Sequence, residues 1–204
     1  MENILKGSDL SIPSKRKDAN KNTEKVLKAA YKVFADKGYD ATIEEIAAEA
    51  GVGVGTVHRR FSNKTVLALA VITDVFSKIK DDQLALIRTP MPVDQKIRLL
   101  FEKFSISHIQ NGKIHALALQ LATAGELGEE MRNSFLFGLD GGLKEVIVQG
   151  QQEGKFRDGD PKLLETLIIN MINPNLVMKL KELLPADQIA RHVSDMILFG
   201  LMKK

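Results

Sequence analysis

The 204-residue sequence predicts an all-α fold, with a small N-terminal helical domain followed by a larger helical region. Apolar residues recur about every three to four positions along most of the chain, which is the spacing of amphipathic helices. No segment alternates apolar and polar residues in the way that a half-buried strand does. Glycine and proline interrupt the pattern at intervals typical of helix ends, so the chain divides into several helices that pack on shared cores.

The composition restricts the class of protein. Hydrophobic residues make up 44% of the chain and charged residues 27%, which is typical of a globular domain, and there is no cysteine for a disulfide or a thiolate metal site. The longest run without a polar residue or glycine, 66–72, is far shorter than the roughly 18 to 20 residues of a membrane span. The N-terminus lacks the apolar segment of a secretory signal. We therefore expect a cytoplasmic protein that does not enter the membrane.

The excess positive charge lies at the N-terminal end. Residues 1–64 contain 12 basic and 9 acidic side chains, whereas the remaining 17 basic and 17 acidic side chains balance. Two basic patches stand out, Lys15-Arg16-Lys17 and the group Arg59, Arg60 and Lys64. They favour a polyanionic partner, although a basic cluster on its own is equally typical of a solvated surface.

The first 66 residues divide into an arm and three helices. Residues 1–21 are polar and aperiodic and predict a flexible basic arm, and a first helix follows from Thr23 to Gly38. Thr42 and Glu45 form the pattern of a capping box that opens a second helix, and Gly51 is suited to end it. A short third helix follows, and Ser62 is the expected cap of a fourth.

The region beyond remains helical. Asp160 and Pro161 predict a helix start, Pro174 must kink or split that helix, and Pro185 opens the last one. We expect three parts: an arm at 1–21, a small helical domain at 22–66, and a larger helical domain at 67–204. The other expected helices cover 65–87, 93–110, 113–122 and 126–150.

Two short helices joined through Gly51, the second of them basic, predict a helix-turn-helix whose second helix enters the DNA major groove. Buried apolar residues such as Ile46, Ala47 and Val57 would fix the angle between the two helices. A longer pattern surrounds them: Ala30, Phe34, Lys37-Gly38-Tyr39, Ala41-Thr42-Ile43, Ile46-Ala47, Ala50-Gly51-Val52, Gly55-Thr56-Val57, Phe61 and Asn63-Lys64. Over these positions the segment 29–69 resembles the N-terminal domain of the tetracycline-repressor (TetR) family of bacterial transcriptional regulators.

This resemblance implies residue roles in binding double-stranded operator DNA. Phosphate contacts would come from Thr42, Thr56, His58 and Lys64, and base-edge contacts from Val54, Gly55, Arg59 and Arg60. His58 departs from the family, which more often has tyrosine at this position. Arg59 is the best candidate for specificity, because a guanidinium can bind O6 and N7 of guanine together.

The middle helices are expected to hold a small apolar effector, although apolar residues at this spacing also form ordinary cores. His108 and His115 are seven residues apart, about 10.5 Å along one helix, which is too far to share a metal. No metal, cofactor or catalytic residue is therefore expected. The candidate effector residues are Leu99, Leu100, Phe104, His108, Ile114, Leu117, Leu121, Phe135 and Val146.

The last helices carry apolar stripes that predict a homodimer. The overall prediction is a repressor with a DNA-binding domain at 22–66 and a ligand-binding and dimerisation domain at 67–204. The effector releases this repressor from a palindromic operator. The alternative is an effector-independent DNA-binding protein whose C-terminal domain binds another protein, and a helical-bundle enzyme is disfavoured because no nucleophile–base spacing is present. The candidate interface residues are Leu164, Leu167, Ile168, Met171, Ile189, Val193, Met196 and Ile197.

Overall fold

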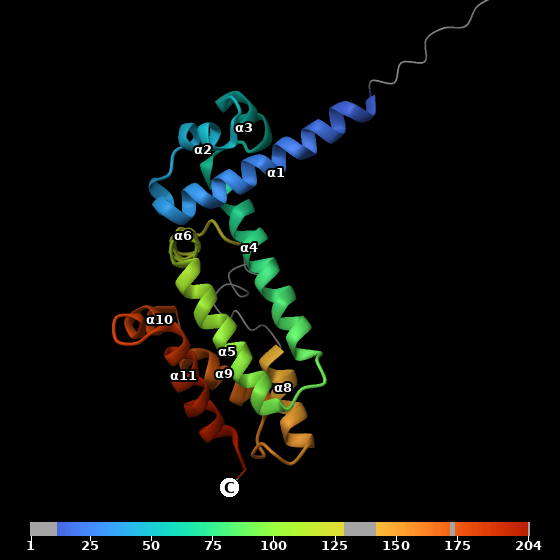
Figure 1. The fold of residues 1–204 in the computed structure, drawn as a ribbon, viewed down its shortest axis with the longest axis vertical. Helices are drawn as coiled ribbons and strands as arrows, with labels where there is room; N and C mark the ends of the chain where they lie inside the picture. The colour runs from blue at the N-terminus through green and yellow to red at the C-terminus, as the bar shows by residue number, and fades with distance from the viewer. Residues whose placement is uncertain (1–11, 129–141, 172–173, 204) are drawn as a thin grey trace, which may run out of the picture. The chain divides into compact units, whose positions relative to one another are not determined.

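The computed structural model describes residues 12–128, 142–171 and 174–203 (Figure 1). Within these ranges the fold is all-α, as predicted, apart from a 3-10 turn and one isolated β-bridge. The chain forms two compact units, Met1–Val71 and Ile72–Lys204. None of the described helices combines the length and the apolarity needed to cross a lipid bilayer.

The N-terminal unit is built on a long first helix. Helix α1 spans Ile12–Lys37 and is followed by a 3-10 turn, Gly38–Asp40, and by α2 (Ile43–Ala50) and α3 (Val54–Arg60). Helix α1 therefore begins before Thr23, and residues 12–21, expected as a flexible arm, are helical, whereas residues 1–11 lie outside the described ranges. Adding turns to an existing helix avoids the cost of nucleation, so a polar segment without an apolar face can extend it.

A small apolar core holds these helices together. Phe34 of α1, Ile46 of α2 and Val57 of α3 are fully buried, and Phe61 closes the core after α3. Full burial of such side chains contributes about 1.5–3 kcal/mol each relative to exposure. The packing therefore fixes the mutual angles of the three helices.

The next helix, α4 (Lys64–Ile87), contains the boundary between the two units. Its cap is Asn63, whose Oδ1 accepts the backbone N–H of Val66 at 2.9 Å. The prediction that Ser62 caps this helix is wrong by one residue. Both side chains are good caps, so the pattern alone does not separate them.

The C-terminal unit continues with helices that follow most of the predicted breaks. Asp160 caps α9 by accepting the backbone N–H of Lys162 at 2.8 Å, and α9 stops before Pro174, where α10 begins. The predicted helix 126–150 can be compared only from residue 142 onwards. The helices are α5 (Val93–Gln110), α6 (Gly112–Thr123), α8 (Gly142–Gln152), α9 (Pro161–Met171), α10 (Pro174–Lys181) and α11 (Ala186–Leu201).

Helix α5 occupies the centre of this unit and packs against α8, α10 and α11. Leu100 of α5, Ile147 of α8 and Ile189 of α11 are fully buried in one core cluster. Gly150 permits a close approach, because a Cβ atom there would lie 2.1 Å from Cδ2 of Phe156. Phe156 in turn forms an antiparallel bridge with Met202, so the turn after α8 is joined to the last described residues.

Candidate nucleic-acid interface

The start of α2 is fixed by the predicted capping box. Oγ1 of Thr42 accepts the backbone N–H of Glu45 at 3.2 Å, and Oε2 of Glu45 accepts the backbone N–H of Thr42 at 3.1 Å. Lys37 donates to Oε1 of Glu45 at 2.6 Å, and this bond is the largest cause lowering the pKa of the Glu45 carboxyl below its ordinary value. The Thr42 hydroxyl acts here as an acceptor, so its hydrogen can still be donated outward.

The turn between α2 and α3 has the geometry predicted for Gly51. This residue has φ 65°, in the left-handed region, and Val52 donates its backbone N–H to the carbonyl of Ala47 at 3.0 Å. A left-handed residue closes a helix C-terminus at least cost when it is glycine. The chain can therefore reverse within three residues and place α3 against α2.

Helix α3 is anchored on one side and open on the other. Val57 points into the core, Val54 and Thr56 are half-buried, and Gly55 is exposed. The three basic residues that end the helix, His58, Arg59 and Arg60, are all exposed. Among the described residues, none forms an ion pair with either arginine. The cationic end of α3 is thus available to an external anion.

Two glycines on this surface have open space around them. A Cβ atom added to Gly53 or Gly55 would meet no heavy atom within 4 Å, and neither residue has a positive φ. Glycine inside a helix costs about 0.5–1 kcal/mol relative to alanine. The fold of the unit therefore does not require glycine at position 55.

Lys64 occupies a different position from the other candidate DNA contacts. Its Nζ donates to the backbone carbonyl of Tyr39 at 2.7 Å and lies 4.1 Å from the centre of the Tyr39 ring. The Tyr39 hydroxyl is 3.4 Å from Oγ1 of Thr65. These contacts tie the start of α4 to the turn before α2. Sequence reasoning missed this role of Tyr39, although both residues stand in the matched pattern.

The candidate effector residues lie inside the C-terminal unit, with Phe135 outside the described ranges. Leu100, Phe104 and Val146 belong to the core cluster, and Leu99 is partly buried against it. Ile114, Leu117 and Leu121 of α6 are buried as well. Burial at these positions fits both a residue of the hydrophobic core and a residue that lines a ligand pocket.

His108 and His115 are much closer than expected. The chain turns at Asn111 between α5 and α6, so the two histidines lie on different helices and their rings stack with centroids 3.8 Å apart. The predicted separation along one helix is therefore wrong. Phe104 packs on His108 at 4.1 Å, and Phe76 meets His115 edge-on at 5.0 Å.

Both histidines are held neutral. Burial, and after it the proximity of His108, lowers the pKa of His115 to about 3. Burial also lowers the pKa of His108, whose Nδ1 donates to the carbonyl oxygen of Phe104 at 2.9 Å. Because Nδ1 of His108 carries the hydrogen, its Nε2 has a lone pair available to accept a hydrogen bond.

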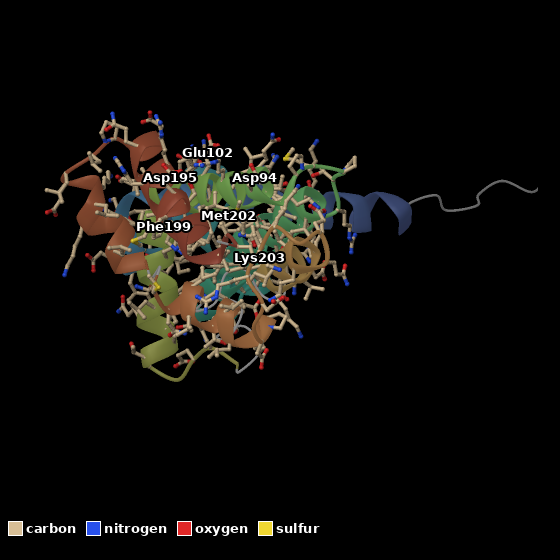
Figure 2. All side chains as sticks on the ribbon, turned by 90° about the horizontal axis from the view of Figure 1, so that it is seen from below. Asp94, Glu102, Asp195, Phe199, Met202 and Lys203 are labelled. Carbon is tan, nitrogen blue, oxygen red and sulfur yellow. The ribbon has the colours of Figure 1, made fainter. Side chains whose placement is uncertain are left out.

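An open groove lies elsewhere in this unit, between α5 and α11. Its volume is ≈ 440 Å³, and charged side chains of both signs line it, with an ion pair between Arg98 and Asp195. Figure 2 shows Asp195 and Glu102 on these two neighbouring helices. None of the candidate effector residues that the structure describes lines the groove, and the lining residues described are Arg98, Glu102, Asp187, Ala190, Arg191, Ser194 and Asp195.

The candidate dimer residues fall into two groups. Leu167, Met171 and Met196 are exposed on α9 and α11, as an interface requires. Leu164 is half-buried against the core. Ile168, Ile189, Val193 and Ile197 are buried within their own chain, so they are withdrawn from the candidate surface.

Other exposed apolar side chains were not expected from the sequence. Phe199 of α11 is 84% exposed, and Leu163 of α9 is also exposed. Phe199 and Met202 both lie at the end of α11 in Figure 2. The spacing of apolar residues predicts stripes on α9 and α11, but it does not predict which side of each helix packs against the core of the same chain.

Two buried charges in this unit also escaped the sequence analysis. The Lys96 side chain on α5 donates to the carbonyl of Ile87 at 2.6 Å and to Oε1 of Gln149 at 2.8 Å. Glu165 on α9 accepts the backbone N–H of Lys144 near the start of α8 at 3.1 Å. Each charge satisfies a backbone group at a helix end, and Glu165 also forms an ion pair with Lys162 at 2.8 Å, so both charges are tolerated inside the unit.

The N-terminal unit matches a family model described as bacterial regulatory proteins, tetR family, over residues 26–71. HTH-type transcriptional regulators from several strains of Staphylococcus aureus are 37% identical to the chain over 75 residues, which are 33% of this chain and 40% of theirs. The matched part of the chain thus spans well under half the length of these curated relatives.

Solved structures resemble nearly the whole chain. A transcriptional regulator from Saccharomonospora viridis in complex with choline has a TM-score of 0.77 at 21% identity, covering 91% of this chain and 100% of that chain. FadR from Bacillus subtilis in complex with stearoyl-CoA has a TM-score of 0.68 at 20% identity, covering 87% and 98%. A TetR-family regulator from Mesorhizobium loti has a TM-score of 0.69 at 19% identity, covering 91% and 98%.

At these identities the solved structures establish only that the fold is shared. The family model identifies the N-terminal unit of this chain. The matched family consists of regulatory proteins, so an enzyme of the helical-bundle type is no longer an alternative. The N-terminal unit, through its match over residues 26–71, is thus a helix-turn-helix unit of the TetR family of bacterial transcriptional regulators, and the all-α fold around it is shared with solved structures of that family.

Proposed function

We propose that the chain is a transcriptional repressor that binds a palindromic DNA operator as a homodimer and is released from it by a small apolar effector. The observation that carries the proposal is the surface of α3, where exposed cations end the helix and Gly55 leaves open space. A glycine that the fold does not need is explained by close approach of a partner from outside. Base pairs in the major groove make such an approach to a recognition helix.

In this proposal each residue of the surface has a distinct role. Arg59 reads a guanine edge through two hydrogen bonds, and Arg60 lies beside it. Val54 and Gly55 face the bases at the start of α3. Thr42, Thr56 and His58 bind phosphates, which set the position of the protein on the duplex without reading sequence.

Lys64 contributes to DNA binding mainly by positioning. An ammonium group has three N–H donors, and the bond to the Tyr39 carbonyl uses one of them. The others can reach a phosphate while the lysine holds the start of α4 against Tyr39. Loss of Lys64 therefore affects both the stability of the unit and its affinity for DNA.

The effector proposal places a small molecule among the helices of the C-terminal unit. Two solved structures of similar fold are complexes with choline and with stearoyl-CoA, which supports the binding of a small molecule by a protein of this fold. The stacked pair of His108 and His115 supplies hydrogen-bonding atoms within an aromatic surrounding. Ligand binding that favours one of two arrangements of the dimer would change its affinity for DNA.

The homodimer rests on the exposed apolar residues of α9 and α11. Leu163, Leu167 and Met171 follow each other at four-residue spacing on α9, and Met196 and Phe199 lie one turn apart on α11. A monomer would leave these side chains in water. Two copies related by a two-fold axis would bury them in a four-helix interface and present two α3 helices to two half-sites. Because the partner is bacterial operator DNA, we also infer a cytoplasmic location.

The alternative is a DNA-binding protein without an effector, whose C-terminal unit binds another protein. The same exposed side chains of α9 and α11 favour it, because a protein partner would cover them as well as a second copy would. The mass of the purified protein in solution separates the two. A monomer at micromolar concentration favours the alternative, and a dimer favours the proposal.

Selection of bound sequences from random double-stranded DNA tests the main proposal. We expect an imperfect palindrome, and we expect binding of the Arg59→Ala variant to lose its preference for that sequence over random DNA. Enriched sites without dyad symmetry would contradict DNA binding by a two-fold symmetric homodimer. Screening apolar compounds for thermal stabilisation, followed by DNA binding with each hit, then tests release, and a stabilising compound without effect on DNA binding would argue against coupling.

A further inference from the structure

One face of α1 carries a row of lysines. Lys21, Lys25 and Lys28 are four and three residues apart, the spacing that aligns side chains on one side of a helix, and all three are exposed. The other side of the same helix carries Val26 and Phe34, which are fully buried. The row therefore points away from the core of the N-terminal unit.

These lysines differ from those nearer the end of α1. Lys32 donates to Oε1 of Glu49 at 2.9 Å, and Lys37 donates to Oε1 of Glu45 at 2.6 Å, so both have carboxylate partners on α2. In the part of the chain that the structure describes, no ion pair involves the three lysines of the row, and Glu24, one turn before Lys28, does not approach it to ion-pair distance. The lysines near the C-terminal end of α1 are thus neutralised, whereas the row in the middle of the helix is not.

An arrangement of this kind weakens the isolated unit. Like charges four residues apart destabilise a helix by about 0.2–0.5 kcal/mol per pair. A solvated helix face ordinarily mixes charges of both signs, which avoids this cost. Among the side chains that the structure describes, the row has no ion-pair partner, so its charge is suited to complement an anion from outside.

We propose that the lysine row of Lys21, Lys25 and Lys28 binds phosphates of the DNA duplex beside the base pairs that α3 reads. The proposal rests on the proposed DNA-binding function, because α1 and α3 belong to the same compact unit. In Figure 1 the ribbon of α1 continues beyond α2 and α3, so this helix is long enough to reach DNA next to the segment that α3 contacts. Seven residues of helix span about 10.5 Å, or roughly three base pairs along the duplex.

The chemistry of lysine determines what this contact does. An ammonium group on a flexible stem binds phosphate as a point charge and reads no base. Each phosphate that the row neutralises releases condensed counterions, so the contact makes binding more sensitive to salt. The row therefore adds affinity for DNA of any sequence and lengthens the protected site, while α3 retains the specificity.

The test compares a triple variant with a charge-matched control. Lys21→Gln, Lys25→Gln and Lys28→Gln remove the row together, and Lys103→Gln, Lys179→Gln and Lys181→Gln remove three exposed lysines from the C-terminal unit. Affinity for the selected operator and for random duplex is measured by fluorescence anisotropy between about 50 and 200 mM salt. Circular dichroism verifies that the helix content is unchanged.

For the row variant we expect the slope of log K against log salt to decrease by about 0.9 for each lysine that contacts a phosphate. Operator and random duplex should lose affinity by the same factor. A duplex trimmed of the flanking base pairs should bind the parent protein and the row variant equally. The control variant should keep the parent slope.

Two failures are distinguishable. If the parent protein enriches no duplex in the selection, the DNA-binding proposal fails and the lysine-row inference falls with it. If the parent binds its operator and the row variant keeps the parent slope and affinity, the inference alone is overturned. A row variant that loses its preference between operator and random DNA would also overturn it, since the row would then read sequence.

Discussion

Lys96 donates a hydrogen bond of 2.6 Å to the carbonyl oxygen of Ile87, the last residue of α4, although the lysine is only 3% exposed. The same ammonium group reaches Oε1 of Gln149 on α8 at 2.8 Å. A single buried cation therefore connects the end of α4 with α5, on which it stands, and with α8. The C-terminal unit uses this charge in place of a helix cap.

Replacing this lysine by methionine should destabilise the protein. Lys96→Met retains the volume of the side chain but leaves the Ile87 carbonyl and the Gln149 amide oxygen without their donor, at a cost of about 1–3 kcal/mol. Urea denaturation measures the loss. Lys103→Met, on the exposed side of the same helix, should change the free energy of unfolding by less than about 0.5 kcal/mol. Equal effects of the two variants would show that the buried contact is not important.

Gly55→Ala should separate stability from DNA binding. The added methyl group meets no atom of the chain and removes a helix-breaking glycine, so the free energy of unfolding should rise by about 0.5–1 kcal/mol. DNA affinity should fall, because the methyl group stands where a base edge approaches. Gly200→Ala on α11, where a Cβ atom is also unobstructed, should stabilise the protein without this loss. An unchanged affinity of Gly55→Ala for the operator would remove position 55 from the interface.

Arg59 and Lys64 should give different signatures on substitution. Arg59→Ala should cost about 1–3 kcal/mol at the selected operator and leave thermal stability unchanged. Lys64→Met should weaken binding to all DNA and also lower the melting temperature, because it loses the contacts with Tyr39. Calorimetry and anisotropy on both variants provide the comparison. A Lys64→Met protein with the parent melting temperature would contradict the positioning role.

The histidine pair should make the protein sensitive to acid. The pKa of His115 is lowered to about 3 in the folded chain, so between that pH and the ordinary value near 6.5 the unfolded chain binds the additional proton. Its contribution to stability is complete above the ordinary value and decreases as the pH falls below it. At pH 5 the loss should be about 2 kcal/mol for this histidine.

Urea denaturation at pH 7.5 and pH 5 tests this, with His192→Phe, an exposed histidine of α11, as the control. The double variant His108→Phe and His115→Leu should have a smaller difference between the two pH values than the parent has. His192→Phe should keep the parent difference. If the double variant loses as much stability between pH 7.5 and pH 5 as the parent does, titratable groups other than the histidine pair cause the acid sensitivity.

The dimer should depend on the exposed side chains of α9 and α11. Leu167→Arg and Phe199→Glu place charges on the candidate interface and should yield monomers with weak affinity for the palindromic operator. Leu183→Arg, in the turn before α11, changes a side chain that is 75% exposed and should leave the dimer intact. Light scattering at micromolar concentration distinguishes these outcomes. A parent protein that is monomeric under the same conditions would exclude the proposed homodimer.

The sequence predicts those features that depend on residues close together along the chain better than those that depend on tertiary contacts. Two local predictions, the Thr42–Glu45 capping box and the end of α2 at Gly51, were confirmed, because each depends on a few adjacent residues, whereas the cap of α4 was misplaced by one residue because Ser62 and Asn63 are both good caps. The stack of His108 and His115 was not predictable, because one residue of turn at Asn111 redirects the chain. Tertiary packing alone separates the four buried side chains of the expected interface from the exposed Phe199.

The two buried charges were not predicted for the same reason, because their burial depends on tertiary contacts. Lys96 and Glu165 look like surface residues in a helical pattern, since charged residues are rarely buried without a partner. Glu165 has a partner on its own helix, Lys162, but the contacts of Lys96 with Ile87 and Gln149 and the contact of Glu165 with Lys144 join different helices, which no periodicity reveals. The candidate DNA surface was easier to predict, because its residues lie within one short segment whose pattern resembles a known family.

The joining of Phe156 to Met202, together with the packing of α5 on α11, has a consequence for the timing of synthesis. The N-terminal unit consists of the first 71 residues and can fold as soon as they have left the ribosome. The core of the second unit cannot close until the last helix has been made, on the order of ten seconds later. During this interval the first unit of a nascent chain is folded, but the apolar side of α5 is exposed because α11, which covers it, has not yet been translated.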